Sequence, residues 1–304
     1  MNKRWFAFCS LSCFAFLAFV ATPIQASNFI DDDVGIAFIH GTSDHRLDAD
    51  GDYWKKSFIQ SIVDVLPNPR NHLIVACDFT HDIWDPAVAG CLSKQITTFV
   101  HEKKIRKLYV YSHSHGGNII RWILSNPSYD PEYPLIIKTI KQVTAIAPSS
   151  GGTELADEVC NGNVFNKSVG WLLGYRNDAI KQQRVGEMAL LNAEVLLGTP
   201  GRPSLPCTFR SVVGTDVFAN PLSQSSYCNG YMLNSGLKFT KTYLDDCSDG
   251  FISCFSQAHA GKVWFYDREK TDNQLPLNHN QSRHSCFYFD QIIRNDIIEQ
   301  GVIR

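Results

Sequence analysis

Hydrophobic positions along the chain form short runs, separated by longer stretches in which apolar residues recur at helical spacing. Short and nearly continuous apolar runs are typical of strands buried on both faces of a sheet, and they occupy residues 34–39, 72–76, 107–112, 143–147, 209–213 and 262–266. Amphipathic stretches predict helices at residues 58–66, 94–104, 118–125 and 287–299. Strands that alternate with helices predict an α/β fold with a mostly parallel sheet and helices on both of its faces.

Residues 151–206 interrupt this alternation. They contain an apolar patch at 169–175, a helical stretch after it, and a Gly-Thr-Pro-Gly turn at 198–201. We interpret the segment as a helical, lid-like insertion within a single domain that spans residues 27–304. The patch around Trp171 serves either as the core of this insertion or as a lid that faces a substrate, and both roles stay open.

The first 26 residues have the layout of a secretory signal peptide. Lys3 and Arg4 provide a positive start, an uncharged apolar run covers residues 5–21, and Pro23 and Ala26 precede the expected cleavage point. A retained membrane anchor is the alternative, because an apolar run of about 17 residues approaches the shortest length that spans a bilayer. The residues at the end of the run favour cleavage, so we expect a secreted or periplasmic protein.

The charge balance bears on the class of partner. The 304 residues include 28 basic and 30 acidic side chains, which gives a net charge of −2. Such a balance provides no broad cationic surface, so a nucleic-acid partner is not expected. A chain with 44% hydrophobic and only 19% charged residues is also not intrinsically disordered.

Cysteine is the unusual residue in this composition. Ten cysteines are a high count for a cytosolic enzyme, and this count agrees with export. Cleavage of the signal peptide leaves eight, and an even number in an oxidising compartment suggests four disulfides. We expect a local bridge between Cys77 and Cys91 and a second one near Cys247 and Cys254. None of the eight forms a Cys-x-x-Cys pair, so a structural zinc site is not expected.

The sequence Ser112-His-Ser-His-Gly-Gly117 carries the sharpest chemical signal. It follows a predicted strand and precedes a predicted helix, which is the context of the nucleophile elbow Gly-x-Ser-x-Gly. Small residues on both sides of the serine allow the tight turn that projects its hydroxyl above the sheet. Ser112 replaces the first glycine as another small residue, and Ser114 is the candidate nucleophile.

A second signal, His40-Gly-Thr42, lies at the end of the first predicted strand. Attack by a serine on a carbonyl creates a negatively charged oxygen that two backbone N–H groups must stabilise. In hydrolases with this layout, one donor is the residue after the nucleophile and the other follows an early strand. The candidate donors are therefore His115 and Thr42, and Gly41 lets the backbone approach closely.

With these motifs the chain resembles the α/β-hydrolase superfamily and, within it, secreted bacterial lipases and esterases. Two further segments extend the resemblance: residues 146–157 are similar to the lipase pattern in which a strand ends in proline before the lid, and residues 248–253 are similar to the Asp-Gly segment that carries the catalytic acid. Together the matches are scattered over residues 36–284. The resemblance implies an α/β-hydrolase fold and a Ser-acid-His triad in that chain order.

Two candidates compete for each remaining triad position. Asp249 and Asp216 are the candidate acids, and we favour Asp249 because a disulfide at its flanking cysteines would hold it rigidly. His279 and His284 both follow the last predicted strand. We favour His279, because Leu277-Asn-His279 resembles a lipase motif and lies nearer that strand.

The favoured hypothesis is a secreted serine hydrolase that cleaves carboxylic esters of small-molecule or lipid type, with transient contact to a lipid surface. An acyltransferase on the same triad and a non-catalytic binding protein of the same fold are the alternatives. No metal or cofactor is expected. The acidic segment 48–52 matches only half of a calcium loop, and neither a Walker lysine nor a Gly-x-Gly-x-x-Gly motif is present.

Overall fold

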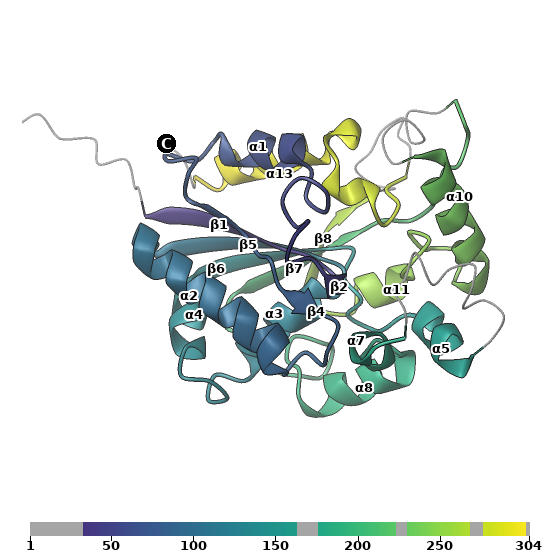
Figure 1. Ribbon diagram of the computed structural model, residues 1–304, viewed down its shortest axis with the longest axis horizontal. Coiled ribbons are helices and arrows are strands. Elements are labelled where there is room, and N and C mark those ends of the chain that lie inside the picture. Colours follow the sequence, from purple (N-terminus) through teal and green to yellow (C-terminus); the bar gives the residue numbers. More distant parts are fainter. Residues whose placement is uncertain (1–32, 163–175, 223–229, 268–275, 302–304) are drawn as a thin grey trace, which may run out of the picture. The chain divides into compact units, whose positions relative to one another are not determined.

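The parallel sheet predicted from the apolar runs is present (Figure 1). The computed structural model describes residues 33–162, 176–222, 230–267 and 276–301, and in this part of the chain six strands follow the order β3-β1-β5-β6-β7-β8, each parallel to its neighbours. They are β1 Val34–Ile39, β3 His72–Ile74, β5 Lys107–His113, β6 Ile140–Ile146, β7 Thr208–Val213 and β8 Lys262–Tyr266. The predicted signal peptide and the apolar patch at 169–175 lie outside the described residues.

Helices cover both faces of this sheet, as the amphipathic pattern predicts (Figure 1). On one face, α1 (Lys56–Val63) and α13 (Phe289–Glu299) lie side by side. The other face carries α2 (Cys91–Lys103), α3 (Gly116–Ser125) and α4 (Tyr133–Thr139). Among the helices of the described segments, none has the length and apolar character needed to cross a bilayer.

Shorter elements connect the main strands and the helices that cover them. The described part of the segment between β6 and β7 contains the helices α5 (Glu154–Asn161), α7 (Asp178–Gln182) and α8 (Val185–Glu194). The remaining elements of the described residues are two short strands, two helices and four short turns. Strands β2 (Ser43–Asp44) and β4 (Asp78–Phe79) pair antiparallel. The helices are α10 (Tyr231–Thr240) and α11 (Cys254–Gln257), and the turns are η1 (Pro86–Gly90), η2 (Lys241–Tyr243), η3 (Gln281–Arg283) and η4 (Ser285–Phe287).

Strand β1 shows why the runs are mostly apolar. Because successive side chains point to opposite faces, Ile36 and Phe38 pack into the cluster shared with α1 and α13, whereas Ala37 and Ile39 pack into the cluster shared with α2 and α3. All four are at most 1% exposed. Burial of a large aliphatic or aromatic side chain contributes about 1.5–3 kcal/mol, so both faces of the strand select for apolar residues.

The strand order changes direction beside β1. The chain passes from β1 to β3 on one side and then returns to β5 on the other side. In open α/β sheets, ligands bind in the crevice outside the carboxyl ends of the strands at such a point. Segment 40–42 directly follows β1 and Ser114 directly follows β5, so the topology brings the two sequence motifs to the same edge.

Both specified disulfides are confirmed. Cys77 and Cys91 are bridged with a Cα–Cα distance of 6.1 Å, and Cys247 and Cys254 with one of 5.4 Å. Each bridge closes a short loop between neighbouring elements.

The expectation of four disulfides is wrong, because Cys160 and Cys207 carry free thiols. Cys160 packs against the small cluster around α5, whereas Cys207 packs against the main cluster beside the sheet. A disulfide requires Cα atoms about 4.4–6.8 Å apart, and an even count says nothing about such proximity. Burial raises the pKa of the Cys207 thiol to about 12, so this thiol is unreactive.

Candidate active site

Ser114 lies at the apex of a strained turn between β5 and α3. Its φ angle of 54° falls in the left-handed region that residues other than glycine seldom adopt, and its N–H donates to the Ile146 carbonyl oxygen at 2.9 Å. A Cβ atom at Gly116 would clash with the backbone carbonyl of His40, so the turn requires glycine there. Fully buried Ser112 occupies the position where the elbow motif has its other glycine. The turn therefore has the geometry that the motif predicts.

The structure brings Ser114 together with the favoured histidine and the favoured acid. The Nε2 atom of His279 lies 3.1 Å from Ser114 Oγ, and its Nδ1 atom lies 2.8 Å from Asp249 Oδ2. All three residues are at most 5% exposed. The ring of Phe251 stacks on the imidazole with the ring centroids 4.6 Å apart, which fixes the plane of His279.

The loop closed by the Cys247–Cys254 disulfide holds Asp249. Asp249 Oδ1 accepts hydrogen bonds from the N–H groups of Phe251 at 2.9 Å and Ile252 at 2.8 Å. The Asp249 carbonyl oxygen accepts from the N–H of His279 at 2.9 Å. One carboxylate oxygen is thus occupied by its own turn and the other faces the imidazole.

The two competing residues lie elsewhere. The carboxylate of Asp216 forms ion pairs with Lys241 at 2.7 Å and Lys238 at 3.6 Å and is 40% exposed. Partial burial acts to raise the pKa of Asp216, but the hydrogen bonds and the lysine charges together outweigh it and lower this pKa. His284 follows the turn η3, and the ring that contacts Ser114 and Asp249 is that of His279.

Thr42 and His115 flank Ser114 from the ends of β1 and β5. Within the described residues, neither of their backbone N–H groups donates a hydrogen bond. A Cβ atom at Gly41 would lie 2.9 Å from Ser114 Cβ, so glycine permits this close approach of the two loops. Two unused N–H groups beside a serine hydroxyl are the arrangement that stabilises an oxyanion.

Burial keeps the neighbouring histidines neutral. It lowers the pKa of His40 to about 3, with a further contribution from the nearby His45. It also lowers the pKa of His115 to about 3. The His113 pKa lies well below its usual range, chiefly because of burial and secondly because of the nearby His279. These three imidazoles therefore carry no charge at neutral pH.

Two buried side chains that support the site have no signal in the sequence. Gln183, at the end of α7, donates to Thr42 Oγ1 at 2.9 Å, while its amide oxygen accepts from Ser149 Oγ at 2.9 Å. Tyr53 lies against His113, with its Oη atom 2.5 Å from His113 Nδ1. The acidic turn before Tyr53 is notable in the sequence only as half of a calcium loop. Contacts between residues so far apart in the sequence produce no motif or characteristic spacing, so neither Gln183 nor Tyr53 could be predicted from the sequence.

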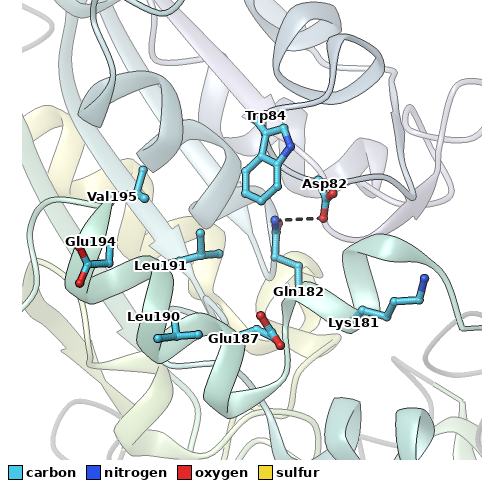
Figure 2. A pocket seen from close by; sticks show the side chains of 9 residues that line it. All are labelled: Asp82, Trp84, Lys181, Gln182, Glu187, Leu190, Leu191, Glu194 and Val195. Carbon is cyan, nitrogen blue, oxygen red and sulfur yellow. Dashed lines mark hydrogen bonds between the residues drawn. The ribbon is translucent and has the colours of Figure 1, made fainter.

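A pocket of about 290 Å³ lies between α7, α8 and the loop after β4 (Figure 2). Trp84, Leu190 and Leu191 provide its apolar lining, and the full set of lining residues is Asp82, Trp84, Lys181, Gln182, Glu187, Leu190, Leu191, Glu194 and Val195. Gln182 donates to Asp82 Oδ1 at 3.2 Å across the pocket. None of the candidate site residues lines it, but Gln182 directly precedes the residue that holds Thr42.

Metal-binding side chains do not converge near Ser114. In the described segments, no group of three or more His, Cys, Asp or Glu side chains has a geometry that could hold a metal ion. In the acidic segment 48–52, Asp48 contacts His45 Nδ1 at 2.8 Å.

The loop that carries Asp249 leads to a prediction about its disulfide. Replacing Cys247 and Cys254 by serine will lower stability by about 2–4 kcal/mol, because the open loop gains conformational freedom in the unfolded chain. It will also lower kcat for the ester hydrolysis that the sequence predicts, because the bridge holds the turn around Asp249. Removing the Cys77–Cys91 bridge is the matched control, and it will lower the melting temperature without changing kcat. Equal effects on kcat from the two pairs would contradict this link.

Solved structures share this architecture. The mature form of lipase BlEst2 from Bacillus licheniformis matches with a TM-score of 0.53 and 16% identity, over 90% of this chain and 91% of that chain. Its propeptide form matches with a TM-score of 0.58 and 14% identity, over 90% of this chain and 51% of that longer chain. The metagenomic carboxyl esterase MGS0156 matches with a TM-score of 0.51 and 12% identity, over 88% and 74% of the two chains.

The structural matches confirm the fold expected from the sequence. The chain has the α/β-hydrolase fold, with a mostly parallel sheet and helices on both faces. No protein-family model matches the sequence, and no curated protein matches it.

Proposed function

We propose that this protein is a serine hydrolase that cleaves carboxylic esters through an acyl-enzyme. Ser114 is the nucleophile, His279 the general base and Asp249 the acid that orients it. The observation that carries the proposal is the buried series of contacts from Asp249 Oδ2 through both ring nitrogens of His279 to Ser114 Oγ. Lipases and a carboxyl esterase among the structural neighbours agree with this class of reaction.

The first half of the reaction transfers the acyl group to Ser114. A proton on Nδ1 of His279 is held by Asp249, so Nε2 is free to take the proton of Ser114. The serine oxygen bonds to the ester carbon, and the displaced electron pair moves to the carbonyl oxygen. The N–H groups of Thr42 and His115 stabilise that oxyanion. When the pair returns, the ester C–O bond breaks and the alcohol leaves with the proton from His279.

The second half releases the acid. His279 takes a proton from a water molecule, and the water oxygen bonds to the acyl carbon. The same two N–H groups stabilise the second oxyanion. The bond between the acyl carbon and Ser114 Oγ then breaks, and the serine oxygen recovers the proton from His279. The sum of both halves is one ester and one water converted to one acid and one alcohol.

Exposed apolar residues on α10 and in the segment before it support an apolar ester as substrate. Leu222 is 83% exposed and Met232, on α10, is 74% exposed. Helix α10 is tied to the His279 loop because Asn278 Nδ2 donates to Asn234 Oδ1 at 3.0 Å. Exposed apolar side chains near a site favour transient contact with a lipid surface.

Export is part of the proposal. The signal-peptide layout of residues 1–26 indicates secretion, and cleavage there would leave one hydrolase domain with its helical insertion at about 151–206. The two disulfides support an oxidising compartment, since such bridges are rare in the cytosol.

The test combines hydrolysis with covalent labelling. We expect the protein to hydrolyse p-nitrophenyl esters of graded chain length, and a fluorophosphonate probe to label Ser114 and stop hydrolysis in proportion. Peptide mass analysis identifies the labelled residue. A label on another residue, or hydrolysis that survives full labelling, would overturn the assignment. Neither hydrolysis nor labelling would favour a binding protein, and preferential transfer to an added alcohol would favour an acyltransferase.

A further inference from the structure

A buried chain of hydrogen bonds links the loop that holds Thr42 to the loop that holds His279. The N–H of Gly41 donates to Tyr53 Oη at 2.7 Å, and Tyr53 Oη lies 2.5 Å from His113 Nδ1. His113 Nε2 lies 2.8 Å from the carbonyl oxygen of His279. Tyr53 is 9% exposed and His113 1%. The chain passes through the residue that precedes Ser114, so it touches all three loops of the site.

The two ends of this chain fix the direction of every hydrogen bond. The Gly41 N–H can only donate, and the His279 carbonyl can only accept. Burial raises the pKa of Tyr53 to about 12, so its hydroxyl keeps its proton and donates it to His113 Nδ1. His113 is neutral for the reason given above, and its single proton lies on Nε2 and is donated to His279. Each group in the chain is satisfied in only this arrangement.

Tyr53 is held firmly by its surroundings. The turn before it is closed by the N–H of Tyr53, which donates to the Asp48 carbonyl oxygen at 2.9 Å. The guanidinium of Arg283 lies 4.2 Å above the phenol ring and also donates to the Tyr53 carbonyl oxygen. The neighbouring Trp54 is completely buried. The acidic turn therefore has a structural role, because it presents the phenol to the site.

The far end of the chain fixes the backbone of His279 from both sides. Its carbonyl accepts from His113, and its N–H donates to the Asp249 carbonyl oxygen at 2.9 Å. A Cβ atom at Gly41 would lie 2.6 Å from Tyr53 Oη, so the phenol occupies the space that this glycine leaves. Loss of the chain would leave the buried Gly41 N–H without its partner and the His279 carbonyl with the Ser282 hydroxyl, 3.0 Å away, as its remaining donor, and would free both loops to shift.

We propose that Tyr53 and His113 are positioning residues that hold the oxyanion N–H of Thr42 and the imidazole of His279 in register with Ser114. Both hold the loops through backbone hydrogen bonds, and the His113 ring also packs against the His279 imidazole with the ring centroids 4.7 Å apart. This inference rests on the proposed esterase activity. Because small displacements of reacting groups lower rates by about 100-fold, the pair sets the rate of acyl transfer without setting substrate affinity.

The test measures kcat and KM with p-nitrophenyl butyrate, per active site titrated with a fluorophosphonate. Tyr53→Phe removes one hydroxyl, and we expect kcat to fall about 10- to 100-fold with KM unchanged. Tyr111→Phe is the matched control. Tyr111 is buried on the same strand as His113, but its hydroxyl has no partner among the described residues, so we expect no change in kcat.

Substitution of His113 separates positioning from packing. His113→Leu keeps the volume but removes the donor to His279, and we expect a fall in kcat at least as large as that of Tyr53→Phe. His113→Gln places an amide N–H near the position of Nε2, and we expect it to restore part of the lost rate. In the double variant Tyr53→Phe/His113→Leu, the fall in kcat will be smaller than the two single effects combined, because both substitutions break the same series of hydrogen bonds.

Two sets of outcomes keep this inference separate from the proposed function. The proposed function would be contradicted if the wild-type protein had no esterase activity, or if its activity survived loss of the Ser114 hydroxyl. An active wild type whose Tyr53→Phe and His113→Leu variants keep the wild-type kcat per titrated site would overturn the inference alone. The inference would also be overturned if the rate per total protein fell only in proportion to the number of titratable sites, because that would indicate loss of folded protein.

Discussion

Replacing Ser114 by alanine will lower kcat for ester hydrolysis by about 10⁵- to 10⁶-fold. The substitution removes the atom that bonds to the acyl carbon, and neither His279 nor the two N–H donors can replace it. The fold will persist, because serine and alanine experience the same backbone strain at the φ angle of 54°. Steady-state hydrolysis of p-nitrophenyl esters, together with the melting temperature, checks both statements.

Ser150→Ala is the matched control for this loss. Ser150 is also completely buried, and its hydroxyl has no partner within the described segments. We expect this variant to hydrolyse esters at the wild-type rate. Retention of more than about 1% of the activity in Ser114→Ala would show that another nucleophile acts, since the oxyanion donors and binding alone leave only a small residual rate.

The sheet could be predicted because its strands are buried on both faces. Each of the six apolar runs overlaps a strand, and the run at 107–112 ends one residue before β5 does. The run at 72–76 is longer than β3, which ends at Ile74, because the Ala76 N–H donates to the side chain of Gln95 rather than to a strand. The β2–β4 pair was missed, because strands of two residues have no periodicity.

The three residues that the structure brings together could be named because their positions follow from topology. Parallel strands end at one edge of the sheet, so residues that follow different strands meet there. Ser114 and His279 are 165 residues apart in the sequence and lie in contact for this reason. Tyr53 and Gln183 could not be found in this way. Their contacts depend on side-chain reach from a turn and from the segment between β6 and β7, and neither residue type carries a motif.

Replacing Asp249 by asparagine will lower kcat by about 10⁴-fold, and the structure explains why the amide has no harmless orientation. Oδ1 of Asp249 accepts two backbone N–H groups, from Phe251 and Ile252, so the oxygen of the introduced amide must occupy this position. The amide NH₂ then replaces Oδ2 and faces His279 Nδ1. An N–H donor at Nδ1 moves the imidazole proton to Nε2, where it blocks transfer of the Ser114 proton.

Asp216→Asn is the control that separates the two candidate acids. Its carboxylate is 40% exposed and pairs with lysines rather than with a histidine, so loss of the charge will cost no more than about 1 kcal/mol of stability and leave kcat unchanged. Measurements of kcat for both variants, with circular dichroism to verify folding, decide the assignment. If Asp216→Asn lost activity and Asp249→Asn retained it, the acid would be Asp216 and the contact between Asp249 and His279 would serve stability alone. The buried carboxylate, the fixed amide geometry and the stacked Phe251 ring all favour the opposite result.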